Sequence, residues 1–291
     1  MTARAQAAPR TVAAQRGGSP LEAIAVHAAF VAAILFFLAP FFWLFTAAFD
    51  ADAAAYIRLP SRFTFDNFVR IFAELGFANA LRNSLLVATA TMVLNVVAVS
   101  LAGYSLSRMR LRAKSAILYG VLLLQTMPLS ATMVPIYGLA RTLGLRNSYL
   151  GLILIHAAIE LPFLVWLMKG FFDSVPRHLE EAAWLDGRSK LRALWEVVVP
   201  VARPGIGVVA GLSFLTAWAE VLMVIILIDK QDMKTVPLAF YETFRTQGGY
   251  TEVQYGLVAA MGVLYLIPVM TIFFATRRLM VRGLISSSRG L

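Results

Sequence analysis

Long apolar runs separated by short polar intervals dominate this chain. Six of the runs reach the roughly 20 residues that a helix needs to cross a lipid bilayer. They cover residues 21–49, 84–106, 116–139, 149–171, 201–228 and 255–276. Pro40 is expected to kink the first of these helices. The pattern predicts an all-α membrane protein with six transmembrane helices, and an even number of spans places both termini on one side.

The longest polar interval in the second half, residues 174–200, predicts a helix-turn-helix outside the membrane, between the fourth and fifth spans. Ser174 is expected to cap the first helix, and Gly187 to adopt the left-handed conformation just past its end. The middle of this helix combines two small residues with two acidic ones, which suit close approach and charge pairing with a partner: Glu180, Glu181, Ala182 and Ala183.

The second helix of this hairpin has an apolar face. Its apolar residues follow the i, i+3, i+4, i+7 spacing of an amphipathic helix: Leu191, Leu194, Trp195 and Val198. Pro200 is expected to end it before the next apolar run.

The spacing within this interval resembles a known motif. Glu181-Ala182-Ala183, three residues, Gly187, nine residues, Val197, one residue and Val199-Pro200 are similar to the EAA loop of permeases in binding-protein-dependent ABC importers. The resemblance implies that Glu181 is a charge partner of an ATPase subunit, that Ala182 and Ala183 are its close-contact sites and that Gly187 forms the turn. The alternative is a solvated amphipathic hairpin with no partner.

The same resemblance implies a set of partners. A second, related permease subunit, two ATP-binding cassette subunits and an extracytoplasmic solute-binding protein or lipoprotein would complete the importer. No phosphate-binding loop of the G-x-x-x-x-G-K-[ST] kind occurs in this chain. We therefore expect no enzyme activity and no cofactor in the chain itself, with ATP and Mg bound by the partner subunits.

Composition supports a membrane protein. Hydrophobic residues make up 59% of the chain, charged residues only 14%, and the mean hydropathy is +0.74. The net charge of +10 does not indicate nucleic-acid binding, because the basic residues lie between apolar runs rather than in one patch. Of the 26 Lys and Arg residues, 17 lie on the side of the termini and the hairpin. The positive-inside rule therefore predicts a multi-pass protein with both termini and the hairpin in the cytoplasm. The resemblance to importer permeases implies that the membrane is a bacterial or archaeal cytoplasmic (inner) membrane.

The N-terminal residues 1–20 differ from the rest. They carry Arg4, Arg10 and Arg16, many alanines and no acidic residue, which predicts a disordered cytoplasmic tail. A transit peptide or the first part of a signal peptide has a similar composition, but the apolar run that follows is longer than a signal core. The permease domain is expected to cover residues 21–291.

The loops on the opposite side suggest a solute class. Residues 50–81 contain LPSRFTFDNFVRIF, and the second span opens with Arg82-Asn83-Ser84. Both resemble the sugar-uptake branch of these permeases, and the resemblance implies an oligosaccharide or disaccharide rather than glycerol phosphate or another small solute. An amphipathic loop lying on the membrane surface is the alternative.

A further external segment, residues 229–254, is rich in aromatic residues and glycine. Resemblance to maltose-type permeases implies a flexible loop that enters the cleft of the binding protein. Its candidate residues are Phe240, Tyr241, Gly248, Gly249 and Tyr250. Anchoring of aromatic side chains at the membrane interface would explain the aromatic residues equally well.

Ionisable residues inside the spans are candidates for the translocation path, because charge at membrane depth is costly. His156 and Glu160 lie four residues apart and therefore share a helical face, and Glu220 follows Trp218 in the fifth span. A metal site is not expected, because two ligands do not complete one. Two interpretations of His156 and Glu160 remain open. They are either a polar pair that faces the interior, a partner subunit or a sugar hydroxyl, or a proton relay. Many sugar permeases of this branch have Asn where this chain has Ala219. This difference argues against a sugar contact at that position.

Two other classes of protein remain as alternatives. An ion-coupled secondary transporter would use Glu160 and His156 but would have no use for the hairpin. A non-transporting membrane scaffold would leave both the hairpin and the external loop unexplained.

Overall fold

The computed structural model describes residues 20–109, 112–245 and 253–288, without side chains at 20, 244–245 and 278–288. This part of the chain is helical throughout and contains no strand, only an isolated antiparallel bridge between Asp50 and Phe63. The prediction of an all-α protein is confirmed for these residues.

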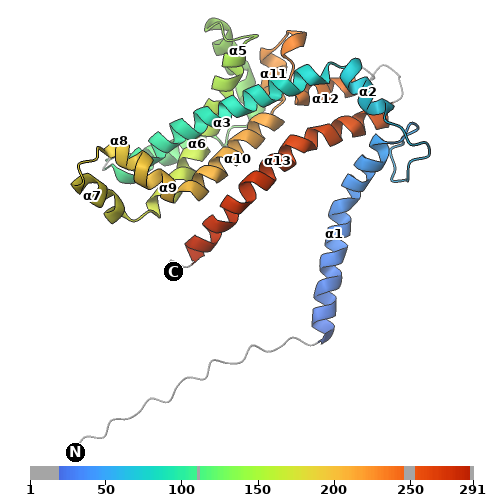
Figure 1. The fold of residues 1–291 in the computed structure, drawn as a ribbon. Coiled ribbons are helices and arrows are strands. Elements are labelled where there is room, and N and C mark those ends of the chain that lie inside the picture. Colours follow the sequence, from blue (N-terminus) through green and yellow to red (C-terminus); the bar gives the residue numbers. More distant parts are fainter. Residues whose placement is uncertain (1–19, 110–111, 246–252, 289–291) are drawn as a thin grey trace, which may run out of the picture.

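Five long helices form the body of the molecule (Figure 1). They are α1 (Pro20–Ala48), α3 (Phe77–Arg108), α6 (Tyr149–Asp173), α10 (Arg203–Ala219) and α13 (Tyr255–Ser288). Four of the described helices are long and apolar enough to cross a membrane, and there are six candidates if each of two bent helix pairs counts as one span. The six apolar runs therefore correspond to the upper count.

The third apolar run is not one straight helix. It forms α4 (Lys114–Leu124) and α5 (Leu129–Thr142), which meet at an angle of 97°. Pro128 lies at the break in an extended conformation, with φ −62° and ψ 136°. Proline has no N–H group to continue the helical hydrogen bonds, so the expectation of a continuous span over residues 116–139 was wrong.

The fifth apolar run is also interrupted. Helix α10 ends at Ala219, and a short helix α11 (Leu222–Leu227) follows. At its other end, α10 meets the preceding segment, Lys190–Val201, at an angle of 84°. The polar hairpin therefore connects to the membrane helix α10 through a sharp corner.

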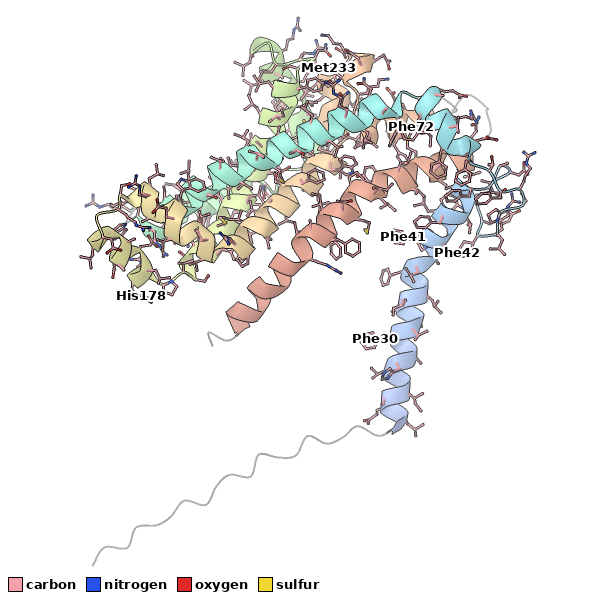
Figure 2. All side chains as sticks on the ribbon, viewed as in Figure 1. Phe30, Phe41, Phe42, Phe72, His178 and Met233 are labelled. Carbon is pink, nitrogen blue, oxygen red and sulfur yellow. The ribbon has the colours of Figure 1, made fainter. Side chains whose placement is uncertain are left out.

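Shorter helices lie at the two ends of the bundle. Figure 2 shows His178 and Phe72 at these opposite ends. The hairpin end contains α7 (Arg177–Leu185), α8 (Lys190–Ala193), the π-helix η1 (Leu194–Val198) and α9 (Val199–Val201). The other end contains α2 (Asp66–Ala73), the 3₁₀-helix η2 (Gln231–Met233) and α12 (Val236–Arg245).

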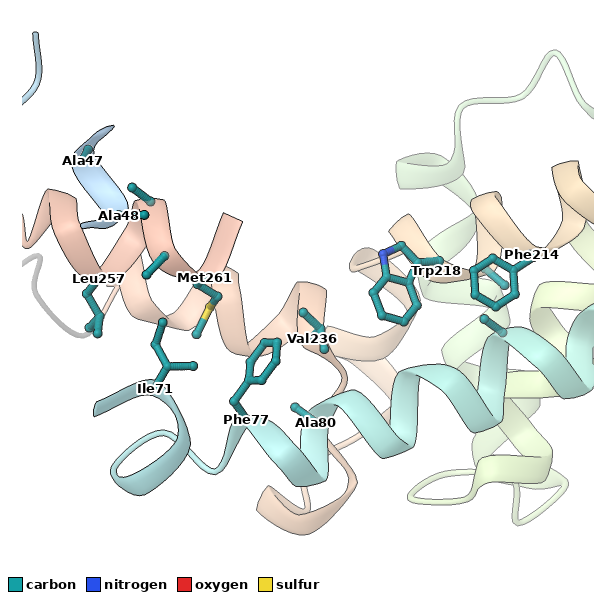
Figure 3. Close-up of a cluster of buried hydrophobic side chains, with 14 residues drawn as sticks. Ala47, Ala48, Ile71, Phe77, Ala80, Phe214, Trp218, Val236, Leu257 and Met261 are labelled. Atoms are coloured by element: carbon teal, nitrogen blue, oxygen red, sulfur yellow. The ribbon is translucent and has the colours of Figure 1, made fainter. Parts of the chain in front are cut away.

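Helix α3 is the centre of the packing, with α6 and α10 beside it and α13 against α10. Phe214 and Trp218 of α10 share a buried cluster with Phe77 of α3 and Met261 of α13 (Figure 3). At Gly205 the helices α6 and α10 approach so closely that an added Cβ atom would lie 2.3 Å from Cγ of Phe171. Small residues at such contacts allow membrane helices to pack tightly.

Helix α1 has most of its surface exposed. Only Ala47 and Ala48 at its end are buried, where α1 packs against α13 (Figure 1). Phe30 and Phe42 project from it (Figure 2), with 65% and 50% of their surface exposed. This apolar surface suits lipid or another membrane helix.

Candidate functional site

The polar interval 174–200 folds as a helical hairpin, which we call the EAA hairpin. Helix α7 ends in a left-handed glycine, Gly187, with φ 82°. The N–H group of Arg188 donates to the carbonyl of Ala183 at 3.0 Å, and that of Gly187 donates to the carbonyl of Trp184 at 3.0 Å. These two bonds are the Schellman arrangement that closes helices at a glycine. The predicted helix, glycine turn and second helix are thus present.

Ser174 does not cap α7, so that prediction was wrong. It keeps a helical conformation at the end of α6, and its hydroxyl donates to the carbonyl of Phe171 at 2.7 Å. Helix α7 starts three residues later, after the extended Pro176. A serine whose own backbone remains helical directs its hydroxyl to the preceding turn and not to the next helix.

The two alanines of the motif face opposite ways. Glu181 and Ala182 are exposed, whereas Ala183 is 5% exposed and packs inside the hairpin. The expectation that both alanines are open to a partner is wrong for Ala183 in this chain. Four large apolar side chains of the hairpin are exposed as well: Trp184, Leu185, Leu191 and Trp195. The exposed surface therefore combines one carboxylate, one small residue and an apolar rim.

The acidic residue next to the motif, Glu180, is not available to a partner. Its side chain is 1% exposed and pairs with Arg108 of α3, with 2.5 Å between Nε and Oε1. The hydroxyl of Tyr104 donates to its other oxygen at 2.9 Å. Sequence reasoning assigned Glu180 to a partner because Arg108 lies far away in the chain, and no local pattern connects the two.

The second arm of the hairpin departs from a regular α-helix. Leu194 and Val198 are buried, while Leu191 and Trp195 face outward, so the expected apolar face is divided between two surfaces. Helix η1 has the wide π-helical turn, in which Val199 donates to the carbonyl of Leu194. Pro200 does not end the helix as expected.

The corner instead lies at Ala202, after α9. Because Pro200 has no N–H group, the wider turn before it accommodates the missing helical hydrogen bond.

A second group of polar residues lies between the spans. Asn95 of α3 is fully buried and donates to Oε2 of Glu160 in α6 and to Oγ of Ser213 in α10, each at 2.9 Å. Glu160 is half-buried, and within the described part of the chain neither His156 nor a basic residue is its hydrogen-bond partner. Asn95 thus links the three central helices at the level of an acidic side chain.

His156 lies one turn away on the same face of α6, as predicted, but it is 3% exposed and its Nε2 has no partner among the described residues. The expected pair of His156 and Glu160 is therefore not formed by a direct bond. Within the described part of the chain, no group of three or more His, Asp or Glu residues is arranged to hold a metal ion.

Trp218 and Glu220, the two path candidates of the fifth span, both make contacts with nearby residues. Trp218 is 1% exposed and packs against the ring of Phe214 (Figure 3) and against that of Tyr265, with centroids 5.9 and 5.7 Å away, while its indole N–H has no hydrogen-bond partner among the described residues. The carboxylate of Glu220 accepts from the N–H groups of Leu222 at 2.9 Å and Met223 at 3.1 Å. Glu220 therefore caps α11 at the break in the span.

The external candidate loop is partly helical. Phe240 and Tyr241 belong to α12, where Phe240 is partly buried and Tyr241 is 42% exposed. A flexible loop was expected over all of residues 229–254, and this is wrong for 236–245. Gly248, Gly249 and Tyr250 lie outside the described residues.

The loop before α2 is organised by Asp50, which sequence reasoning missed. Its carboxylate is 1% exposed and accepts hydrogen bonds from Arg58 at 2.9 Å and from the hydroxyl of Ser61 at 2.9 Å. Backbone N–H groups of Asp52 and Arg62 add to these. Burial alone would raise the pKa of Asp50, but these donors outweigh it and lower the pKa to about 2.

The Asn83-Ser84 pair also has a structural role. The amide of Asn83 donates to the carbonyls of Asp232 and Lys234, at 2.8 and 2.9 Å. The hydroxyl of Ser84 accepts from the N–H group of Val236 at 2.8 Å. These bonds fix the segment around η2 and α12 on the start of α3.

Comparison with known proteins agrees with this architecture. The chain is 33% identical over 233 residues to the maltodextrin transport system permease protein MdxG of Bacillus subtilis, covering 80% of this chain and 83% of the relative. It is 29% identical over 261 residues to the diacetylchitobiose uptake system permease protein DasC of Streptomyces coelicolor, covering 87% and 93%. A chain of a solved bacterial ABC transporter that imports the acidic polysaccharide alginate has the same fold, with a TM-score of 0.76, 22% identity and coverage of 89% and 96%.

The family model described as "Binding-protein-dependent transport system inner membrane component" matches residues 95–286, which include the second part of α3, all of α6 and α10 and the whole EAA hairpin. The chain therefore belongs to this family and is a permease subunit of a binding-protein-dependent ABC importer, an integral protein of the inner membrane.

Proposed function

We propose that this chain forms half of the translocation pathway of an ATP-driven sugar importer, and that the EAA hairpin is where its ATPase subunit docks. The observation that carries the proposal is the exposed surface of the hairpin. Glu181 and Ala182 face outward beside Trp184 and Leu185, while Gly187 closes α7. A carboxylate, a small residue and exposed apolar side chains suit a partner with a basic group and an apolar groove.

The packing of the hairpin suits the transmission of movement from an ATPase subunit to the membrane helices. It joins α6 at one end and α10 at the other, and its buried residues Val175, Leu194 and Val198 pack in one cluster with Phe172 of α6 and Val209 of α10. Closure of two ATPase subunits around ATP and Mg would press on the hairpin of each permease. Because the hairpin shares its core with the spans, the displacement would rock them between inward-open and outward-open states.

The orientation follows from charge. The sequence segments expected on the hairpin side of the membrane carry 17 of the 26 Lys and Arg residues, which favours placement of the hairpin in the cytoplasm, where ATP is available. Both termini would then lie in the cytoplasm, with α2, η2 and α12 outside. On that outer side, Tyr241 and the segment with Gly248, Gly249 and Tyr250 would face an extracytoplasmic binding protein.

Sugar is the proposed solute class. Both relatives described above are named for carbohydrate uptake, of maltodextrin and of diacetylchitobiose. In this chain, Glu160 and Glu220 are both half-buried, but the carboxylate of Glu220 already accepts hydrogen bonds from the backbone at the start of α11, so Glu160, which Asn95 holds in place, is the path candidate. A carboxylate of this kind accepts hydrogen bonds from sugar hydroxyl groups. His156, Trp218 and Glu220 would support the path from behind.

Site-directed cross-linking tests this proposal. The chain contains no cysteine, so a single Glu181→Cys variant places one thiol on the hairpin. After photo-crosslinker labelling in membranes of the native host, mass spectrometry should identify an ATP-binding cassette subunit joined to position 181, with a second permease in the same purified complex. The control, Ala78→Cys at the exposed start of α3, should not yield that product.

Recovery of an ATPase-free assembly from both variants would contradict the proposal and favour an ion-coupled transporter.

A further inference from the structure

A buried ion pair connects the EAA hairpin to the central membrane helix. Glu180 of α7 is 1% exposed, the side chain of Arg108 at the end of α3 is 10% exposed, and their charged atoms are 2.5 Å apart. Arg108 also donates through Nη2 to the carbonyl of Val175, 2.8 Å away, just before α7. Tyr104, one turn earlier in α3, donates to the second oxygen of Glu180 at 2.9 Å. Two side chains of α3 thus hold both oxygens of one carboxylate.

This connection resists being opened. A buried carboxylate without its partner is strongly destabilising, because the charge has lost both water and its counter-ion. Movement of α7 away from α3 would leave Glu180 and Arg108 in that condition. Sliding of α7 would also break the bond from Arg108 to the backbone at Val175, so the pair constrains the direction of movement as well as the distance.

The same end of α3 is tied to α6. Ser107 donates to Oδ1 of Asp173 at 2.6 Å, and Lys169 pairs with the other oxygen of Asp173. The hairpin is covalently joined to α6 and, through its corner, to α10. Helix α3 is the central span that has no direct covalent connection to the hairpin, so side-chain contacts are what must link the two.

We propose that Arg108 and Glu180, assisted by Tyr104, form a positioning link that makes the EAA hairpin and α3 move as one body. A push on the exposed Glu181 side of α7 would then reach α3, which carries Asn95 and its bond to Glu160. This inference rests on the proposed function, because it concerns how docking of an ATPase at the hairpin reaches the membrane path. The link acts through position, because both side chains are buried and paired with each other.

The first measurement tests the rigid connection in the isolated chain. Cysteines introduced at the exposed Leu101 of α3 and Arg177 of α7 carry spin labels, and pulsed electron paramagnetic resonance gives the distance distribution between them. We expect one narrow distribution for the wild-type sequence and a broad one for the double variant Arg108→Gln with Glu180→Gln. The double variant is chosen because it removes the link without leaving a buried charge unpaired. An unchanged width would overturn the proposal.

The second measurement separates positioning from stability. Complexes purified with their ATPase subunits are reconstituted in vesicles, and uptake of labelled maltodextrin and diacetylchitobiose is measured per ATP hydrolysed. The double variant should lower this ratio about fivefold or more, within the range of coupling between protein sites, while the bound ATPase stays near its wild-type amount. Arg108→Lys, which keeps the charge, should recover part of the ratio.

Arg62→Gln is the matched control. Arg62 also pairs with a carboxylate, that of Asp52 at 3.5 Å, but both side chains are exposed and lie at the opposite end of the bundle. The ratio of uptake to ATP hydrolysis in the Arg62→Gln variant should equal that of the wild type. A wild-type ratio of uptake to ATP hydrolysis in the double variant would overturn the link. So would a loss of uptake in strict proportion to the loss of bound ATPase subunit. Absence of ATP-dependent uptake by the wild-type complex would contradict the proposed function itself, and the spectroscopic test would still decide the link.

Discussion

Two neighbouring alanines in the EAA hairpin should respond oppositely to the same enlargement. Ala182 is exposed, whereas Ala183 is 5% exposed and its carbonyl accepts the hydrogen bond that closes α7 at Gly187. Substitution by leucine adds three carbon atoms at either position. At Ala183 these atoms enter the packed interior of the hairpin, and at Ala182 they extend into the surface where we propose that the ATPase docks.

The magnitudes follow from burial. Enlarging a residue in a packed interior costs about 1–3 kcal/mol, so Ala183→Leu should lower the stability of the chain by that amount. A substitution on an exposed surface usually changes stability by less than about 0.5 kcal/mol, so Ala182→Leu should leave the chain as stable as the wild type. Ala182→Leu should instead weaken ATPase binding, by about tenfold if the contact loses about 1.4 kcal/mol.

The assay has two readouts on the same detergent-purified chain. Thermal unfolding reports stability, and titration with the purified ATPase subunit reports affinity. Ala183→Leu should lower the unfolding temperature, and Ala182→Leu should lower only the affinity. Equal unfolding temperatures for both variants would refute the assignment of Ala183 to the interior. Normal affinity of Ala182→Leu would refute the docking surface.

Three further outcomes follow from the described contacts. Asp50→Asn should cost about 1–2 kcal/mol at neutral pH, because a neutral amide accepts weaker hydrogen bonds from Arg58. The fold lowers the pKa of Asp50 from 3.8 to about 2, so the wild type should be more stable than Asp50→Asn at pH values above 3.8. This difference in stability should be lost as the pH falls through about 2, and thermal unfolding at a series of pH values measures it. Gly205→Ala should destabilise the packing of α6 and α10 by about 1–3 kcal/mol, because its Cβ atom would lie 2.3 Å from the ring of Phe171; an unfolding temperature at or above that of the wild type would contradict this. Glu220→Ala should cost about 0.5–2 kcal/mol through the lost cap of α11, and hydrogen exchange should be faster in α11 but not in α6.

The apolar pattern predicted the class of fold because burial in lipid demands long apolar helices. It could not predict where those helices break. The break after α4 depends on Pro128, and prolines also occur inside α1, α6 and α13, at Pro40, Pro162 and Pro268, where the helix continues. Whether a proline ends a helix is decided by neighbouring helices that can satisfy the freed backbone groups, and a single sequence does not show these.

Those features of the hairpin that depend on neighbouring residues in the sequence could be predicted. Gly187 and the spacing of the motif are local, and the structure has the turn where it was expected. The orientation of Ala183 depends on how α7 packs against η1 in the other arm of the hairpin. The burial of Glu180 depends on Arg108, which belongs to another part of the chain. Charge pairs across such separations appear only when the helices are placed beside each other.

The candidates for the path show the same limit. Trp218 and Glu220 were chosen because polar groups at membrane depth are costly. The backbone at the start of α11 satisfies the carboxylate of Glu220, whereas Trp218 packs among aromatic rings and its indole N–H has no partner among the described residues. Asn95 connects Glu160 and Ser213 by hydrogen bonds. Residue type alone does not distinguish a polar side chain that serves the fold from one that faces the solute.

The measurement that tests the central claim most directly is uptake of a labelled sugar into vesicles containing this chain with its partner permease and ATPase subunits. We predict uptake of maltodextrin or diacetylchitobiose only when ATP and Mg are present on the hairpin side and the binding protein on the other. Uptake that proceeds without ATP and follows an imposed proton or sodium gradient would contradict the account.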